Sequence, residues 1–358
     1  MIEIKPDFER LKRALFCQEP DRVPLIELVI DEEIKEAFLG KLVNDLKTEI
    51  EFRLKAGYDY VWLTKGMVDP TGTVDKTIER KSTVISRARY SVYSSKEVEK
   101  VWANENKGVI TTAKDFEKYP WPEPEREDFS VYEEIKKYLP QGMEVIAVLG
   151  KVFTATWMLM GFNAFCYSLT ENLKLVEAMF SRIGEIQLEV FKKVVEFDSI
   201  GAIWIVDDIA YSTGLIVSPQ ILRRYLFPWY KKMGDICKEK GLPFIYHSDG
   251  NLWEVMDDLI DIGFNALHPI EPMAMDIKEL KEKVGGKLCL LGNIDLDRLS
   301  RGTPKEIKDM VRENIKNIAP GGGYCIGSSN SVTNYVPLKN YKALLEATFE
   351  YGRYPLDL

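Results

Sequence analysis

The chain has 358 residues, of which 46% are hydrophobic and 29% charged, and its formal net charge is −8. This composition is typical of a globular protein with a large core, and the negative charge argues against broad electrostatic binding of nucleic acid. No run of about 20 apolar residues could span a bilayer, and Met1–Lys12 lacks the apolar stretch of a secretory signal. We therefore expect a cytoplasmic protein with neither a membrane nor a nucleic-acid partner.

The predicted elements begin with an amphipathic helix over Phe8–Cys17 and continue with eight short apolar strands. Caps mark the helices between the later strands, because Ser218-Pro219 and Thr303-Pro304 are typical helix starts. Gly241 and Gly263 are typical helix ends. The predicted strands are Val23–Ile30, Tyr60–Leu63, Val145–Leu149, Ala202–Val206, Phe244–Tyr246, Ala266–His268, Leu288–Leu291 and Tyr324–Ile326.

These strands are apolar throughout rather than alternating, which favours a parallel sheet buried on both faces. Eight strands separated by helices predict a (β/α)8 TIM barrel, with an open doubly wound sheet as the alternative. We expect one domain over residues 1–358.

The interval at about 66–141 is too long for one strand–helix unit and is interpreted as an insertion near the barrel mouth. Within it, Lys81–Tyr93 alternates like a short hairpin, and Tyr119–Pro124 is a proline-rich, extended connector. A lid over the mouth and a plain surface elaboration are both compatible with this pattern.

His247 and Asp249 follow the predicted strand Phe244–Tyr246, just before the flexible Gly250. The carboxyl ends of barrel strands carry the active site, so both side chains are predicted to reach one pocket. His247 is one of only two histidines, the other being His268. It can serve as an acid or base, as a metal ligand or as a structural residue.

Further polar residues lie at other strand ends. Asp207 and Asp208 end one strand, and adjacent residues of an extended chain face opposite ways, so we expect one to line the site and the other to anchor the loop. We assign Asp207 to the site. Glu271 and Asn293 end the sixth and seventh predicted strands. Both are candidates for binding substrate or for holding loops.

Glu27 would be an acid within the first strand, either buried for a task or facing solvent. The last strand ends in Ser328–Ser331, a neutral polar run around Asn330 that favours hydrogen-bond recognition over nucleophilic catalysis.

A metal site is a further interpretation of these residues. His247 and Asp249, together with Glu271 or Asp207, would offer the nitrogen and oxygen ligands that catalytic zinc accepts. The five cysteines are scattered without close-pair spacing, so they predict neither a disulfide framework nor a zinc ribbon.

Several short motifs, in this order and spacing, resemble the uroporphyrinogen decarboxylase superfamily over nearly the whole chain. The matching stretches are Asp21–Pro24, Asp207–Pro219, Tyr225–Tyr230, Phe244–Gly250, Leu291–Asn293 and Gly322–Asn330. The resemblance implies a single (β/α)8 barrel with its site in a deep mouth. The superfamily contains haem-pathway decarboxylases and methyltransferases that move methyl groups to or from corrinoid proteins.

Departures from the superfamily pattern distinguish the two groups. Decarboxylases of this kind carry an arginine pair where this chain has Leu25–Asp31, and Glu27 and Asp31 would repel a substrate bearing eight carboxylates. Methyltransferases that serve thiols hold zinc with His-x-Cys and a late cysteine. Here the first motif is His247-Ser-Asp249, and the late position falls among Ser328–Asn330.

The resemblance therefore implies methyl transfer between a corrinoid-binding partner protein and a small methylated amine or ether, or tetrahydrofolate as co-substrate. In that interpretation His247 and Asp249 handle a proton or bind an activating metal, with zinc left open. The substrate would contact the remaining candidates, which are Glu27, Trp62, Asp207, Tyr246, Glu271, Asn293 and Asn330. A homo-oligomer is compatible with the sequence. The alternatives are a uroporphyrinogen decarboxylase and a non-catalytic barrel that only binds a ligand.

Overall fold

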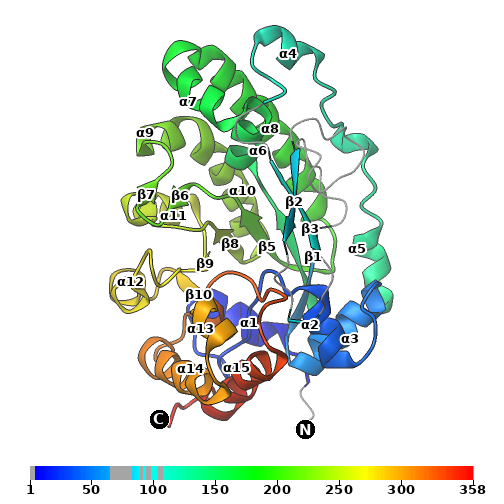
Figure 1. Ribbon diagram of the computed structural model, residues 1–358, viewed down its shortest axis with the longest axis vertical. Helices are drawn as coiled ribbons and strands as arrows, with labels where there is room; N and C mark the ends of the chain where they lie inside the picture. The colour runs from blue at the N-terminus through cyan, green and yellow to red at the C-terminus, as the bar shows by residue number, and fades with distance from the viewer. Residues whose placement is uncertain (1–4, 65–82, 89–91, 94–97, 104–107, 358) are drawn as a thin grey trace.

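The computed structural model describes residues 5–64, 83–88, 92–93, 98–103 and 108–357, and its centre is a curved sheet of seven parallel strands (Figure 1). In sheet order these are β1 (Tyr60–Leu63), β4 (Glu144–Leu149), β5 (Ile200–Val206), β8 (Phe244–His247), β9 (Ala266–His268), β10 (Cys289–Ile294) and β11 (Tyr324–Ser328). The predicted α/β class with a parallel sheet is confirmed, and seven of the eight predicted strands lie at the predicted places.

Nearly every strand residue is buried, which explains why the strands are apolar on both faces rather than alternating. The parallel register pairs Val206 of β5 with His247 of β8, and His247 with His268 of β9. Because all these strands run the same way, the polar residues that follow them emerge at one edge of the sheet.

The first predicted strand differs from the expectation. Val23–Ile30 contains no regular strand, but isolated parallel bridges join Leu25 to Ile326 and Ile30 to Val332. Pro24 has no amide hydrogen to donate, although its carbonyl accepts a bond from the Ile326 amide. The described residues thus form a seven-stranded sheet with this segment alongside β11.

Helices flank the sheet, and the first and last helices, α1 and α15, lie at the same end of the molecule in Figure 1. The longer helices are α1 (Phe8–Leu15), α2 (Glu32–Leu39), α3 (Leu46–Ala56), α6 (Val152–Met160), α7 (Phe162–Glu171), α8 (Leu173–Val194), α10 (Phe227–Lys240), α11 (Met256–Ile262), α12 (Ile277–Val284), α14 (Pro304–Ile318) and α15 (Leu338–Tyr351). The shorter ones are α4 (Ala113–Lys118), α5 (Val131–Glu134), α9 (Pro219–Ile221), α13 (Leu296–Arg301), and the single turns η1 (Pro124–Arg126), η2 (Ile135–Lys137), η3 (Leu222–Leu226) and η4 (Trp253–Val255).

The predicted helix ends are confirmed. Thr303 forms a capping box with Glu306 at the start of α14, and Gly241 and Gly263 end α10 and α11 in the left-handed conformation. In the described part of the chain no single helix is long and apolar enough to cross a membrane. One pair, α6 and α7, meets the length and composition criteria together but bends by 96° between its halves.

Helix α1 packs across the amino-terminal end of the sheet. It contacts both β5 and β11, and a Cβ at Gly201 would fall 2.4 Å from the Phe8 ring. Because Leu11, Ala14 and Leu15 are fully buried, this helix closes the amino-terminal end of the sheet with apolar contacts.

The insertion at about 66–141 is described only in part, because residues 65–82, 89–91, 94–97 and 104–107 lie outside the described residues. Strand β2 (Thr83–Ala88) lies inside the predicted hairpin Lys81–Tyr93, but it pairs antiparallel with β3 (Val98–Ala103), beyond that segment. The prediction therefore located the first strand of the hairpin, but it expected the second strand before Tyr93, whereas that strand begins at Val98. The Val92 amide and the Tyr93 hydroxyl donate to the carbonyls of Asn334 and Val336, so this part of the insertion contacts the segment that follows β11.

Replacing Gly327 tests how the N-terminal segment sits on β11. A Cβ at Gly327 would lie 1.9 Å from the Ile26 carbonyl oxygen, so Gly327→Ala should displace the segment and lower stability by about 3 kcal/mol, at the upper end of overpacking costs. Urea unfolding measures this change. Gly286→Ala is the comparator, because its Cβ meets open space at a positive φ and should cost only about 1 kcal/mol. Equal losses in the two variants would contradict the close contact.

Candidate functional site

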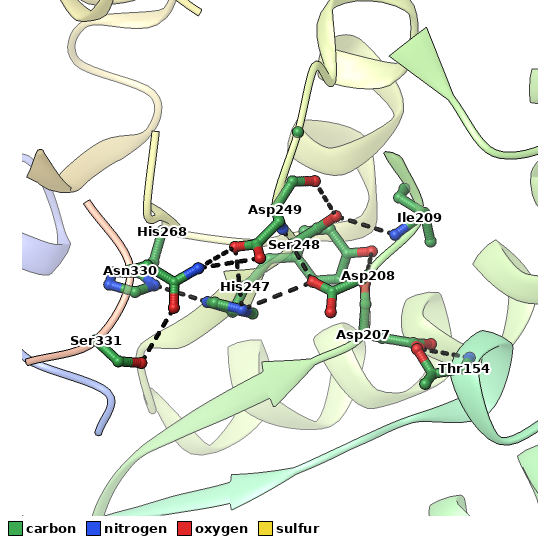
Figure 2. A network of polar contacts seen from close by, with 12 residues as sticks. Thr154, Asp207, Asp208, Ile209, His247, Ser248, Asp249, His268, Asn330 and Ser331 are labelled. Atoms are coloured by element: carbon green, nitrogen blue, oxygen red, sulfur yellow. Dashed lines mark hydrogen bonds and ion pairs between the residues drawn. The ribbon is translucent and has the colours of Figure 1, made fainter. Parts of the chain in front are cut away.

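His247 is the last residue of β8, and its ring lies at the carboxyl edge of the sheet, beneath two carboxylates (Figure 2). It is only 5% exposed. Its Nε2 atom lies 3.6 Å from Asp208 Oδ1 and 3.7 Å from Asp249 Oδ1. The structure therefore brings the two residues predicted as catalytic, His247 and Asp249, into one cluster, and adds Asp208 to it.

A second histidine lies against the inner side of His247. The Nδ1 atoms of His247 and His268 are 2.7 Å apart, and the two rings stack with centroids 5.0 Å apart. His268 is fully buried, and the Trp204 ring packs edge-to-face against it. His247 is thus held between an apolar interior and a polar mouth.

The acids of the cluster are held in place by local hydrogen bonds. Asp208 accepts a bond of 2.9 Å from the Asp249 amide, and the Asn330 Nδ2 atom donates to both oxygens of Asp249 at 2.9 and 3.0 Å. Glu271 accepts from the Gly250 amide at 2.8 Å. Asn330 and Glu271, both predicted to bind substrate, therefore lie beside Asp249 and the loop that follows it.

The Gly250 position explains why the loop after β8 can turn so tightly. Gly250 has φ +91, and a Cβ there would lie 2.6 Å from the Tyr211 carbonyl oxygen. Only glycine fits this backbone without strain. The turn sends the chain away directly after Asp249 and leaves that side chain facing His247.

Burial and like charges set the protonation of the cluster. Burial and then the Asp208 carboxylate raise the pKa of Asp249 to about 7, partly offset by the Asn330 hydrogen bond. Burial and the charge on Asp249 raise the pKa of Glu271. Burial lowers the pKa of His247 against the attraction of Asp208 and Glu271, so near neutral pH the cluster holds a neutral imidazole and acids that gain protons readily.

The structure turns the two adjacent acids to opposite sides, and Asp207, the one predicted to line the site, does not face His247. Asp207 is buried and accepts bonds of 2.7 Å from the amides of Phe153 and Thr154 at the start of α6, plus a short bond from the Tyr230 hydroxyl. Asp208 instead faces His247. Adjacent residues of an extended chain point to opposite sides, so one acid anchors a helix while the other lines the site.

Tyr246 was predicted to contact the substrate, and the structure buries it on the other side of β8. It precedes His247 on β8 and so faces the opposite side of the strand. Its fully buried ring packs on Tyr230 and Phe264, and its hydroxyl donates to the Asp207 carbonyl. That position leaves Tyr246 no open surface for a substrate.

Two other candidates lie on strands that do not adjoin β8. Asn293 on β10 is buried and accepts a bond of 3.0 Å from Asn314 Nδ2 on α14. Trp62 on β1 is partly buried, and its indole Nε1 has no hydrogen-bond partner among the described residues. No contact described in the structure joins either side chain to the His247 cluster, so their substrate-binding roles stay predictions.

Glu27 is buried and does not face solvent, which were the two alternatives for this acid in the sequence. Its carboxyl oxygens accept bonds of 2.6 and 2.7 Å from the Ser328 amide and hydroxyl, at the end of β11. Burial raises the pKa of Glu27 to about 8, against the hydrogen bonds from Ser328 and the positive charge of Arg53. Glu27 thus ties the N-terminal segment to the strand that leads to Asn330.

Two residues of the cluster were missing from the predicted site, and both carried a signal in the sequence. Asp208 was seen as one of a pair of adjacent acids, and the sequence did not show which one faced inward. His268 ends the strand that follows β8, and the parallel register pairs it directly with His247. Matching the ends of consecutive predicted strands would have placed the two histidines together.

Asp208, His247 and Asp249 could also hold a metal ion. One donor atom from each lies within 4.8 Å of the others. Ligands at about 2.0–2.2 Å from a tetrahedral zinc lie roughly 3.4 Å from one another, close to the 3.6 and 3.7 Å measured from His247 Nε2. The donor set of one imidazole and two carboxylates fits zinc, with a fourth position left for a substrate or water.

A model of the uroporphyrinogen decarboxylase family matches residues 99–351, well over half of the chain. The chain belongs to this family. Among curated proteins, the uroporphyrinogen decarboxylase of Actinobacillus succinogenes is 26% identical over 109 residues. The match covers 30% of this chain and 29% of that protein, so it spans less than a third of the relative's length.

Among solved structures, a methyltransferase from Methanosarcina mazei is similar to this family member over most of both chains. The TM-score is 0.68, and the match covers 96% of this chain and 98% of the methyltransferase. The sequence identity is 19%, so the comparison shows a shared fold.

The raised pKa of Glu27 predicts a specific dependence of stability on pH. The folded protein keeps the Glu27 proton up to about pH 8, whereas the unfolded chain releases it near the ordinary value of 4.5. Between these values the folded state binds more protons, so stability should fall as pH rises, by up to about 1.4 kcal/mol per pH unit. Glu27→Gln should remove this component from urea-unfolding curves measured from about pH 5 to about pH 8.

The exposed Glu282 offers a matched control. Glu282→Gln should leave the slope of stability against pH as it is in the parent protein. A slope that is unchanged in Glu27→Gln would show that the buried carboxyl is ionised in the folded state.

Proposed function

We propose that this family member is a methyltransferase that moves a methyl group between a small substrate and a corrinoid carried by a partner protein. The small substrate would be a methylated amine or ether, or tetrahydrofolate. The observation that carries the proposal is the charge of the cluster around His247. The strongest charge interactions of His247, Asp249 and Glu271 are with one another and with Asp208.

Such a cluster is unfavourable for a porphyrinogen that bears many carboxylates. Like charges a few ångströms apart repel strongly where water is partly excluded, and burial together with the like charges already present raises the pKa of Asp249 and of Glu271. Leu25–Asp31, where related decarboxylases carry arginines, contains no arginine that could bind a carboxylate. The acids suit a neutral or cationic methyl donor or acceptor better.

The proposed barrel is closed, with Val23–Ile30 as its eighth strand and the segment at about 66–141 inserted near the mouth. Two observations support closure. Parallel bridges join the N-terminal segment to β11, and the Tyr60 hydroxyl bonds to both the amide and the carbonyl of Glu27, which links the segment to β1. The site would then lie in a mouth open to the partner.

The chain's own residues would orient the small substrate and manage its proton. Methyl transfer to or from a nitrogen or oxygen requires that atom to gain or lose a proton, and a group with a pKa near neutrality does this most efficiently. Asp249, whose pKa burial and Asp208 raise to about 7, meets that condition. His247 lies 3.7 Å from it, and Asn330 keeps the carboxylate in place.

The corrinoid would supply the cobalt centre that takes or gives the methyl group. A zinc ion, if held by Asp208, His247 and Asp249, would supply Lewis-acid activation of the heteroatom. Elemental analysis of the purified protein distinguishes the two roles of the cluster. One zinc per chain would assign these residues to ligation, whereas an active, zinc-free protein would assign them to proton handling.

Methyl transfer itself is tested by anaerobic absorbance measurements. Reduced corrinoid with candidate methyl donors, or methylcobalamin with tetrahydrofolate, should show gain or loss of the cobalt–methyl band in the presence of the protein. His247→Ala should reduce the rate by about 100-fold or more, since general acid–base residues contribute factors of about 100 to 10,000.

The exposed Lys278 provides the control, because Lys278→Ala alters a surface ion pair with Glu313 and should leave the rate unchanged. A cobalt–methyl band that does not change with any donor or acceptor, in a protein whose fold is intact by circular dichroism, would contradict the proposal. It would favour a barrel that only binds a ligand.

The family also supports a second candidate, a decarboxylase acting on a porphyrinogen. The matched family model and the curated relative both carry that name. The acidic mouth is the observation against it, and turnover of uroporphyrinogen would decide in its favour.

A further inference from the structure

The contact between the two histidines fixes which nitrogen of His247 faces the mouth. The Nδ1 atoms lie 2.7 Å apart, a hydrogen-bond distance, so one of them must carry the proton and the other must accept it. Whichever donates, Nδ1 of His247 is occupied on the inner side. Nε2 is left as the atom that faces Asp208 and Asp249 (Figure 2).

The two possible arrangements of the shared proton have different electrostatic consequences. If His247 donates from Nδ1, its Nε2 carries a bare lone pair 3.6 and 3.7 Å from two carboxylate oxygens, which repel it. If His268 donates, the single N–H proton of the neutral His247 ring sits on Nε2 and is attracted to the same oxygens.

The surroundings of His268 also favour His268 as the donor. Its Nε2 atom is buried and has no hydrogen-bond partner among the described residues. A proton placed there would be an orphaned buried N–H, which native structures rarely tolerate. With the proton on Nδ1 instead, the single N–H group of His268 donates its hydrogen bond to His247.

We propose that His268 is the positioning residue of the site: it donates from Nδ1 to His247 Nδ1, orients that ring, and keeps a proton on His247 Nε2 facing Asp208 and Asp249. The role in catalysis rests on the proposed function, whereas the proton arrangement does not. His247 then faces the substrate as a hydrogen-bond donor from Nε2, and a metal ion would have to displace that proton before it could bind there.

Nitrogen NMR of the imidazoles tests this arrangement directly, and the chain has only two histidines to resolve. In protein labelled with 15N-histidine and treated with a chelator, we expect His247 to carry its proton on Nε2 and His268 on Nδ1. His268→Phe, which keeps a flat ring against Trp204, assigns the signals and removes the donor. The remaining His247 signals should then move toward those of a ring that exchanges between both tautomers.

The signals of the parent protein can also be assigned without a substitution, from the proximity of the His268 ring protons to the Trp204 ring, so a variant that fails to fold does not weaken the measurement. A His247 ring protonated on Nδ1 in chelated protein, or one that exchanges freely between tautomers, would overturn the proposal. Unaltered His247 signals in folded His268→Phe would overturn it as well.

Activity gives a second readout once a substrate is known. His268→Phe should lower kcat by about 10- to 100-fold, the usual effect of losing a group that orients a reacting residue, and leave KM nearly unchanged. Equal changes in kcat and KM would contradict a positioning role. Absence of methyl transfer in the parent protein would contradict the proposed function alone and leave the NMR result intact.

Discussion

The structure depends on one constraint at the carboxyl edge of the sheet, where a buried imidazole is fixed on its inner side by a second imidazole and faced on its outer side by acids. The parallel register of β8 and β9 places His247 opposite His268. The register of β5 and β8 brings Asp208 above the same ring. His247 therefore has one nitrogen committed to the interior and one available to the mouth.

Burial makes this arrangement chemically useful and also costly. Removal of water raises the pKa of Asp249 and of Glu271 and lowers the pKa of His247, so each group is driven toward its neutral form. Neighbouring acids in contact with a neutral histidine are characteristic of sites that exchange protons or hold a cation. The loop glycine Gly250 and the amide of Asn330 keep the acids together despite their repulsion.

Much of the fold could be predicted from the sequence, because short apolar runs separated by capped helices specify a parallel sheet. The N-terminal segment could not, since side chains take the place of backbone partners there: the Ser328 amide donates to the Glu27 carboxyl and the Glu27 amide to the Tyr60 hydroxyl, and only isolated bridges form. At the candidate site, position at a strand end was sufficient to predict that His247 and Asp249 lie together. It was insufficient for Asp207 and Asp208, because alternation shows that two neighbours diverge without showing which one points inward. The outward position of Tyr246 follows from the same alternation, once His247 is known to point inward.

In the function we propose, the acidic cluster of this family member serves methyl transfer and excludes polycarboxylate substrates. Anaerobic incubation with uroporphyrinogen, followed by separation of the products according to their number of carboxyl groups, distinguishes this function from decarboxylation. Every carboxyl group should be retained at protein concentrations that support methyl transfer. Stepwise loss of carboxyl groups, abolished by Asp249→Asn, would contradict it.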